Sequence, residues 1–71
     1  MSGMITLRVN DGDCPCPVDS TVATLLERMQ LGGRSGLAVA VNDRVIPARA
    51  RESHRLLAGD EVLIIQATQG G

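Results

Sequence analysis

The feature that most constrains the fold of this 71-residue chain is the apolar run Val62-Leu63-Ile64-Ile65, close to its end. Four consecutive aliphatic residues, three of them β-branched, are typical of a central strand that is buried on both faces of a sheet. We therefore predict that residues 61–66 form the middle strand of a single small domain. A domain of this size buries only about 60% of the surface of its unfolded chain.

Two earlier segments alternate as the strands of a hairpin do. Residues 4–9 place three apolar side chains on one face, and residues 14–18 alternate Cys14, Cys16 and Val18 with two prolines. Between them we predict a four-residue loop, residues 10–13. This loop turns the nitrogens of both prolines away from the first strand, which makes the second strand an edge strand.

One helix and two short strands complete the pattern. Residues 19–21 offer N-cap oxygens, residues 32–33 are glycines suited to a helix C-terminus, and between them lies one apolar stripe: Val22, Leu25, Leu26 and Met29. Strands are predicted at 37–41 and 44–46, joined by a tight turn at Asn42-Asp43. Residues 48–54 form a basic loop or a single helical turn, which is either a solvated face or a contact for an acidic partner.

The order of these elements is hairpin, helix, then three strands, with the last strand in the middle. This is the order of the ubiquitin-like β-grasp, an α+β fold with a mixed sheet of about five strands and one main helix packed on one face. One helix can cover only one face of the sheet, so the other keeps exposed apolar side chains that mark a partner surface. We expect a domain at 1–66 and a flexible tail at 67–71.

Side-chain chemistry inside the domain is sparse. Cys14 and Cys16 stand one residue apart, where a bridge would close almost no loop, so we expect reduced thiols packed in the core. A metal half-site or a redox pair would have only His54 as a further partner. Because His54 has no Ser, Asp or nucleophilic Cys at motif spacing, we predict no catalytic residue, no metal site and no enzymatic activity.

The composition also argues against nucleic-acid-binding, membrane and secreted proteins. The net charge is −1 and aromatic residues are absent, which argues against a nucleic-acid partner. The chain has no apolar run near the roughly 20 residues of a membrane span and no signal-peptide pattern, so we expect a cytoplasmic protein without a membrane partner. Either Met1 or Met4 is compatible with the natural start.

The tail Gln69-Gly70-Gly71 is open to two interpretations. Glycine loses the most backbone entropy on ordering, so two terminal glycines do not complete a fold and could be a frayed end. They also lack Cβ atoms and could enter a slot too narrow for other residues. An α-carboxylate ordinarily has a pKa of about 3.3–3.7, so the one at this end is anionic at pH 7.

Four segments together resemble the ThiS family of sulfur carriers in thiamine biosynthesis: 38–42 (AVAVN), 45–47 (VIP), 59–62 (GDEV) and 69–71 (QGG). The resemblance implies that a ThiF-like adenylyltransferase uses ATP to adenylate the Gly71 carboxylate. Sulfur from a cysteine desulfurase relay then gives a thiocarboxylate, which donates sulfur to a ThiG-like thiazole synthase. The carrier itself is expected to bind no cofactor.

The resemblance also assigns roles at the end of the chain. Residues 67–71 would extend about 17 Å at about 3.4 Å each, so that Ala67, Thr68, Gln69 and Gly70 carry Gly71 into a partner's buried site. Likeness to ubiquitin places Val62 and Ile64 toward the helix, and Leu63 and Ile65 toward partners.

Other functions are compatible with the same residues. The same fold carries sulfur in the small subunit of molybdopterin synthase, whose chains tend to be longer and richer in Phe, and in cysteine or methionine synthesis. A ubiquitin-like modifier would end as an isopeptide on lysine. A TGS-like binding module would have no need of a Gly-Gly end.

Overall fold

The computed structural model describes residues 3–66, so the predicted tail and its boundary with the domain lie outside the described residues. The described chain contains these elements in order: β1 (Met4–Val9), β2 (Gly12–Pro17), α1 (Val22–Arg28), β3 (Leu37–Val41), β4 (Arg44–Val45), the 3₁₀ turn η1 (Ala48–Ala50) and β5 (Glu61–Gln66).

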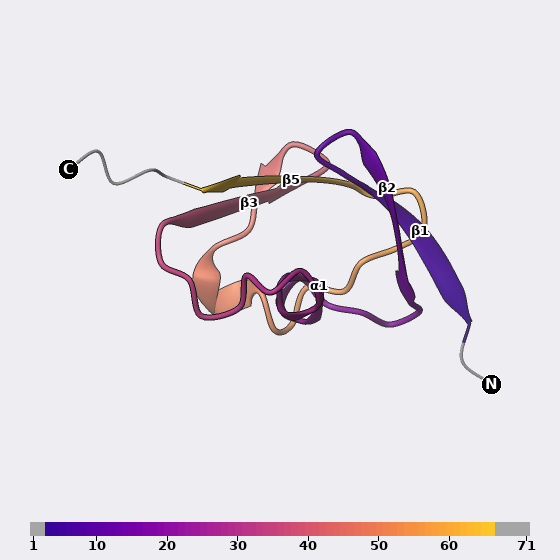
Figure 1. Ribbon diagram of the computed structural model, residues 1–71, viewed down its shortest axis with the longest axis horizontal. Coiled ribbons are helices and arrows are strands. Elements are labelled where there is room, and N and C mark those ends of the chain that lie inside the picture. The colour runs from indigo at the N-terminus through magenta and orange to yellow at the C-terminus, as the bar shows by residue number, and fades with distance from the viewer. Residues whose placement is uncertain (1–2, 67–71) are drawn as a thin grey trace.

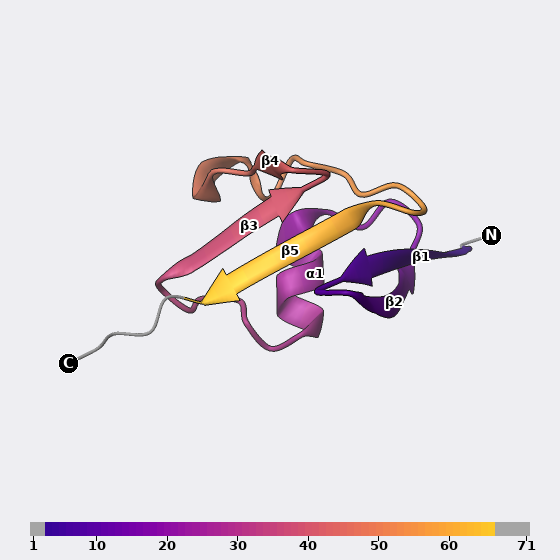
Figure 2. The same ribbon diagram turned by 90° about the horizontal axis from the view of Figure 1, so that it is seen from above.

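The five strands form one mixed sheet in the order β2-β1-β5-β3-β4. β1 is parallel to β5, and the other neighbouring pairs are antiparallel. The helix α1 packs across one face of this sheet, and the opposite face has no such cover (Figure 1, Figure 2). The predicted β-grasp architecture, with the last strand in the middle, is confirmed.

The burial of β5 differs between its two faces. Val62 and Ile64 are 3% and 8% exposed and point toward α1, whereas Leu63 and Ile65 are 49% and 54% exposed on the other face. The central position and these orientations agree with the sequence prediction. The expectation that an apolar run is buried on both faces is wrong here, because the single helix covers only one side of the sheet.

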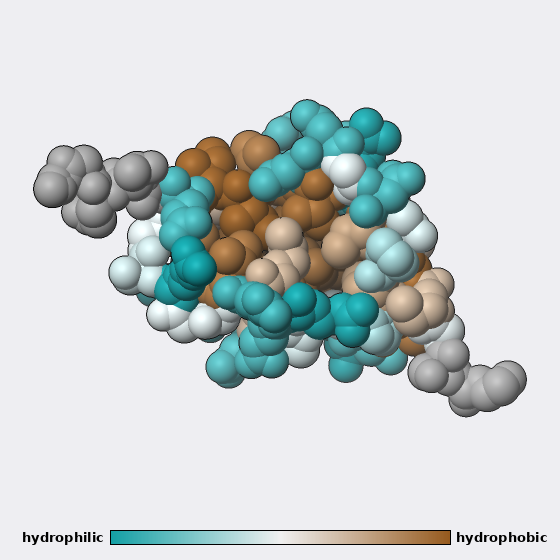
Figure 3. Space-filling view, in the orientation of Figure 1, coloured by the Kyte–Doolittle hydropathy of each residue, from teal (hydrophilic) through white to brown (hydrophobic). Residues whose placement is uncertain are grey.

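The core lies between the sheet and α1 and contains no aromatic side chain among its members: Leu7, Val9, Cys16, Val22, Leu25, Leu26, Val39, Val41, Ile46, Leu56, Val62 and Ile64. Cys16 is fully buried, while Cys14 is half-buried against the same cluster, and both are free thiols. Both cysteines therefore pack as small hydrophobic side chains, as predicted. Apolar side chains are also visible in the space between sheet and helix (Figure 3).

The β1–β2 hairpin has a tighter turn than predicted. Val9 pairs with Gly12, so the loop is Asn10-Asp11, with φ of 50° and 68°, and not residues 10–13. Two left-handed residues make the type I′ turn that suits strand twist, and Asn and Asp tolerate it better than most residues. The loop is therefore two residues shorter than predicted, and β2 begins at Gly12.

Both prolines of β2 still face away from β1. Pro15 lies opposite Thr6, one step from the pair Leu7–Cys14. In a hairpin with a two-residue turn, the pair that closes the turn, here Val9–Gly12, is hydrogen-bonded, and the following pairs alternate between non-hydrogen-bonded and hydrogen-bonded. Pro15 and Pro17 therefore lie at non-hydrogen-bonded positions. β2 is thus an edge strand, as predicted, but it ends at Pro17, and Val18 is 43% exposed.

The helix begins as predicted and ends early. Thr21 is the N-cap, and its side chain and that of Thr24 form a reciprocal capping box. The C-terminus is a Schellman motif, in which the amides of Gln30 and Leu31 donate to the carbonyls of Glu27 and Leu26 at 3.0 and 2.8 Å. Gln30, with φ of 62°, takes the left-handed position that we assigned to Gly32-Gly33.

The segment after β3 follows the prediction closely. Asn42-Asp43 is a tight turn with φ of 51° and 70°, and residues 48–50 form a single 3₁₀ turn. β4 ends at Val45, and Ile46 turns into the core. Arg51 is half-buried and donates from Nη2 to the Leu37 carbonyl at 2.7 Å, so this arginine is a structural contact and not part of a solvated face.

Candidate functional site

The face of the sheet opposite α1 carries an apolar patch on the neighbouring strands β5, β3 and β4. Ala40 pairs with Leu63 and also with Val45, and Ala38 pairs with Ile65. Directly paired residues share a face of a sheet. These five residues, which we call the sheet patch, lie on β4, on β3 and on residues 63–65 of β5.

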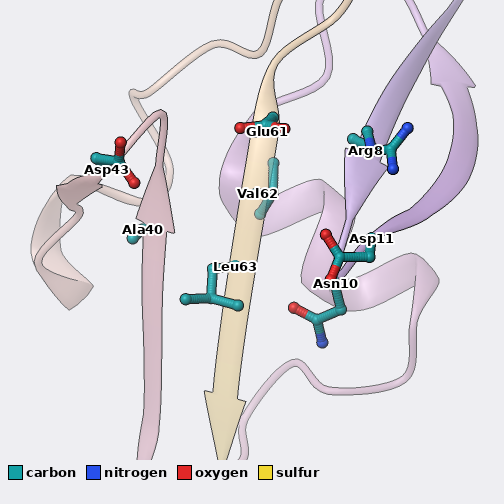
Figure 4. A pocket seen from close by; sticks show the side chains of 8 residues that line it. All are labelled: Arg8, Asn10, Asp11, Ala40, Asp43, Glu61, Val62 and Leu63. Atoms are coloured by element: carbon teal, nitrogen blue, oxygen red, sulfur yellow. The ribbon is translucent and has the colours of Figure 1, made fainter.

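A hollow of about 190 Å³ adjoins Leu63 on this face (Figure 4). Its lining residues are Arg8, Asn10, Asp11, Ala40, Asp43, Glu61, Val62 and Leu63. The volume is below the roughly 300 Å³ at which pockets for drug-sized ligands begin. The hollow therefore suits a single side chain of a docked protein better than an organic cofactor.

Charges around the hollow are predominantly acidic. Asp11, Asp43 and Glu61 stand against a single cation, Arg8. Charges at the rim of an interface change the association rate and the choice of partner more than the final affinity. The rim of the hollow therefore disfavours a partner with acidic side chains at this position.

Two asparagines hold β5 from its two sides, and the sequence interpretation missed both. Asn10 bonds to the backbone of Ile64 through its side-chain amide. Asn42 accepts from the Glu61 amide at 3.0 Å and donates to Asp60 Oδ1 at 3.0 Å. The available signal was the repeated dipeptide Asn-Asp at 10–11 and 42–43, since each copy opens a left-handed turn beside β5.

The start of β5 is fixed by the same network. Asp60 Oδ2 accepts from the Leu57 amide at 2.8 Å, and the Gly59 amide donates to the Thr6 carbonyl at 2.9 Å. Gly59 has φ of 84°, a conformation that L side chains rarely adopt. The loop before β5 is thereby tied to β1, and β5 is held at its beginning.

The structure places part of the predicted site. Leu63 and Ile65 lie together on the exposed face, whereas the tail residues Ala67, Thr68, Gln69, Gly70 and Gly71 lie outside the described residues. Contact of Leu63 and Ile65 with a partner stays a prediction.

Other side chains of residues 3–66 form no recognisable reactive centre. No group of three His, Cys, Asp or Glu residues there is arranged to hold a metal ion. His54 is half-buried, and its backbone amide and carbonyl bond to Ala50 and Val22. None of the helices within 3–66 has the length and apolarity that crossing a membrane requires.

Comparison with known proteins gives three concordant findings. The model of the ThiS family matches residues 7–71. The sulfur carrier protein ThiS of Escherichia coli (strain K12) is 32% identical over 62 residues, which cover 87% of this chain and 92% of the relative. The crystal structure of the thiamine biosynthesis protein ThiS from Geobacter metallireducens superposes with a TM-score of 0.72 at 25% identity, covering 94% of this chain and all of the neighbour.

Proposed function

The chain belongs to the ThiS family, and we propose that it carries sulfur for thiazole formation in thiamine biosynthesis as a thiocarboxylate on Gly71. The observation that carries the proposal is the extent of the family match, which reaches residue 71 and so includes the Gly-Gly end together with the fold. A match to the fold alone would have supported a binding module equally well.

The chemistry starts from an unreactive group. A carboxylate resists nucleophiles because its charge must be displaced and its oxygens are poor leaving groups. Attack of a Gly71 carboxylate oxygen on the α-phosphorus of ATP gives an acyl-adenylate and releases pyrophosphate. The terminal sulfur of a persulfide from the desulfurase relay then attacks the acyl carbon, AMP leaves, and an acyl disulfide forms. A second thiol attacks the relay's own sulfur in this acyl disulfide, forms a disulfide with it, and releases the thiocarboxylate, which is a strong nucleophile at sulfur.

Partners supply the catalytic groups in this scheme. A ThiF-like adenylyltransferase binds ATP, a cysteine desulfurase relay provides sulfur, and a ThiG-like thiazole synthase accepts it. The carrier binds no cofactor, performs no catalysis of its own and works in the cytoplasm, where ATP is available. Its own contribution is to dock through the domain while Ala67, Thr68, Gln69 and Gly70 carry the reacting residue into the partner's site.

The sheet patch is the docking surface in this proposal. Leu63 and Ile65 are exposed aliphatic side chains in the middle of the sheet, flanked by the small side chains of Ala38 and Ala40. Exposed apolar side chains that lie together on one face are typical of protein interaction sites. The patch lies at the tail end of β5, so a partner seated on it would be close to residue 67.

The mass of the intact chain tests the function directly. After incubation with the adenylyltransferase, the desulfurase, free cysteine as sulfur donor, a thiol reductant and ATP, we expect a product in which one oxygen atom has been replaced by sulfur. Conjugation to lysine side chains of other proteins would instead indicate a ubiquitin-like modifier, and an unchanged mass would indicate a binding module. Assignment to the thiazole pathway then requires sulfur transfer to a reconstituted thiazole synthase, since carriers for molybdopterin or for cysteine and methionine would load in the same way.

Leu63→Asp is expected to weaken binding to the adenylyltransferase by at least about tenfold. Placing a carboxylate in an apolar contact removes buried area and adds a desolvation cost, and central interface residues contribute about 1–2 kcal/mol or more each. Isothermal titration calorimetry with the purified partner measures the loss. Unchanged affinity would count against the sheet patch as the docking surface.

A matched control is Leu57→Asp. Leu57 is 68% exposed and precedes β5 outside the sheet patch, so the same change in charge and size occurs away from the proposed contact. We expect this variant to bind as the unchanged chain does. Both variants should unfold at similar temperatures, because neither side chain belongs to the core.

A further inference from the structure

Residues 63–66 of β5 have a strand neighbour on only one side. β3 pairs with β5 as far as Gln66, whereas β1 pairs with it only at Glu61 and Val62. Figure 2 shows β5 running on beyond the end of β1. A strand edge without a neighbour leaves backbone N–H and C=O groups unpaired.

The side chain of Asn10 takes the place of the missing strand. The backbone N–H of Asn10 donates to the Val62 carbonyl at 2.9 Å, and within residues 3–66 this is the last backbone hydrogen bond that β5 receives from the β1 side. Further along β5, the Ile64 N–H donates to Asn10 Oδ1 at 2.8 Å, and Asn10 Nδ2 donates to the Ile64 carbonyl at 3.2 Å. One carboxamide thus satisfies both backbone groups of Ile64, which in a longer parallel β1 would bond to two different residues.

The turn that follows β1 makes this contact possible. Asn10 has φ of 50°, so the main chain leaves the sheet at this residue while its side chain continues beside β5. The contact spans 54 positions in the sequence and is partly buried. It lies on the part of β5 that β1 does not pair with, residues 63–66, which includes Leu63 and Ile65.

We propose that Asn10 is a positioning residue for the tail, a proposal that rests on the proposed sulfur-carrier function. By holding Ile64, the carboxamide keeps the last part of β5 ordered, so that the sheet patch and the start of residues 67–71 are presented to the adenylating partner in a fixed arrangement. Without the Asn10 carboxamide, residues 63–66 of β5 become ordered only when the partner binds. The entropy cost of this ordering raises the KM of the adenylating partner for the carrier.

The test uses Asn10→Gly with Asn42→Gly as its matched control. Glycine adopts positive φ without strain, so each variant keeps its turn and loses only a side-chain amide. Asn42 also bonds to the backbone of β5, but at Glu61, the end distant from the tail. Both variants should therefore lose similar stability, while only Asn10→Gly alters the end that precedes the tail.

Two measurements are required on the full-length chain. Without partner, amide hydrogen exchange should show Ile64 exchanging about tenfold faster in Asn10→Gly and unchanged in Asn42→Gly, because Asn10 is the acceptor of that N–H. With the adenylyltransferase and ATP, pyrophosphate release should show KM for the carrier raised about tenfold in Asn10→Gly with little change in kcat. An effect on KM alone is the signature of lost binding common to ground and transition states.

Each outcome is decisive. An equal KM for both glycine variants would reduce Asn10 to a general contributor to stability and overturn its positioning role. Unchanged exchange at Ile64 would show that the contact does not hold the strand, and would also overturn it. If the unchanged chain releases no pyrophosphate, the proposed function fails, and the exchange measurement still reports separately on the contact between Asn10 and Ile64.

Discussion

Gly71→Ala is expected to lower the yield of thiocarboxylate by about 100-fold or more while the domain stays folded. Under the proposed function, the added methyl group would lie directly beside the reacting carboxyl, in a site that would have to accept the chain end through a narrow slot. A misplacement of about 1 Å in an enzyme's reactive complex costs about 100-fold in rate. The intact mass of the chain after incubation with adenylyltransferase, desulfurase, free cysteine, a thiol reductant and ATP gives the yield.

Gly3→Ala is the control for this substitution. A Cβ at Gly3 has no heavy atom within 4 Å in the structure, so the same chemical change occurs at the other end of the chain without contact. This variant should load sulfur normally. Normal loading of Gly71→Ala would contradict a narrow slot that requires glycine at position 71, and a loss of folding in Gly71→Ala would show that the tail belongs to the domain.

Leu25→Ala is expected to have the largest effect on stability. Leu25 is fully buried in the stripe of α1 that faces the sheet. Removing a buried leucine side chain costs about 2–5 kcal/mol, because the apolar contacts are lost and the cavity is only partly refilled. A domain of this length has about 4–11 kcal/mol of total stability at 0.05–0.15 kcal/mol per residue, so the variant should be close to unfolding at 25 °C.

Thermal or urea unfolding followed by circular dichroism measures this loss. Leu57→Ala is the matched control, since Leu57 is 68% exposed and the same atoms are removed from solvent contact instead of from the core. We expect a change within about 0.5 kcal/mol for this surface substitution. Equal destabilisation by both substitutions would contradict the core derived from burial.

The two substitutions separate the fold from the chemistry. Gly71→Ala should leave the unfolding midpoint unchanged and lower loading by about 100-fold or more, whereas Leu25→Ala should reduce loading only in proportion to the folded fraction. At a temperature where the folded fraction of Leu25→Ala is measurable, the rate of loading per folded molecule should equal that of the unchanged chain.

Element types were predictable because local pattern and burial agree. The alternation of residues 4–9, the apolar stripe that begins at Val22, and the apolar run in β5 each correspond to the observed element. The exposed side of β5 was predictable only from likeness to ubiquitin, since an uninterrupted apolar run does not distinguish the two faces of a strand.

Boundaries and turn lengths were less accessible. The helix ends at Arg28 because the chain after Met29 forms a Schellman motif with Gln30 in the left-handed conformation, although glycines follow at 32–33. The first hairpin turns at Asn10-Asp11 and not across residues 10–13, because two side chains that tolerate positive φ suffice for a type I′ turn. In both places several neighbouring residues can adopt the positive φ that the turn or the helix end requires, and tertiary packing selects among them.

The sequence by itself determined the class of fold, the apolar core and the glycine end that the proposed chemistry uses, because periodicity and residue type act locally along the chain. Only the tertiary structure decided how β5 is held: Asn10 reaches Ile64 and Asn42 reaches Glu61, across 54 and 19 positions of sequence. These contacts depend on which strands become neighbours and where each one stops. That outcome is set by burial of the whole sheet against α1; the repeated Asn-Asp dipeptide marks the two turns but does not encode which strand each one meets.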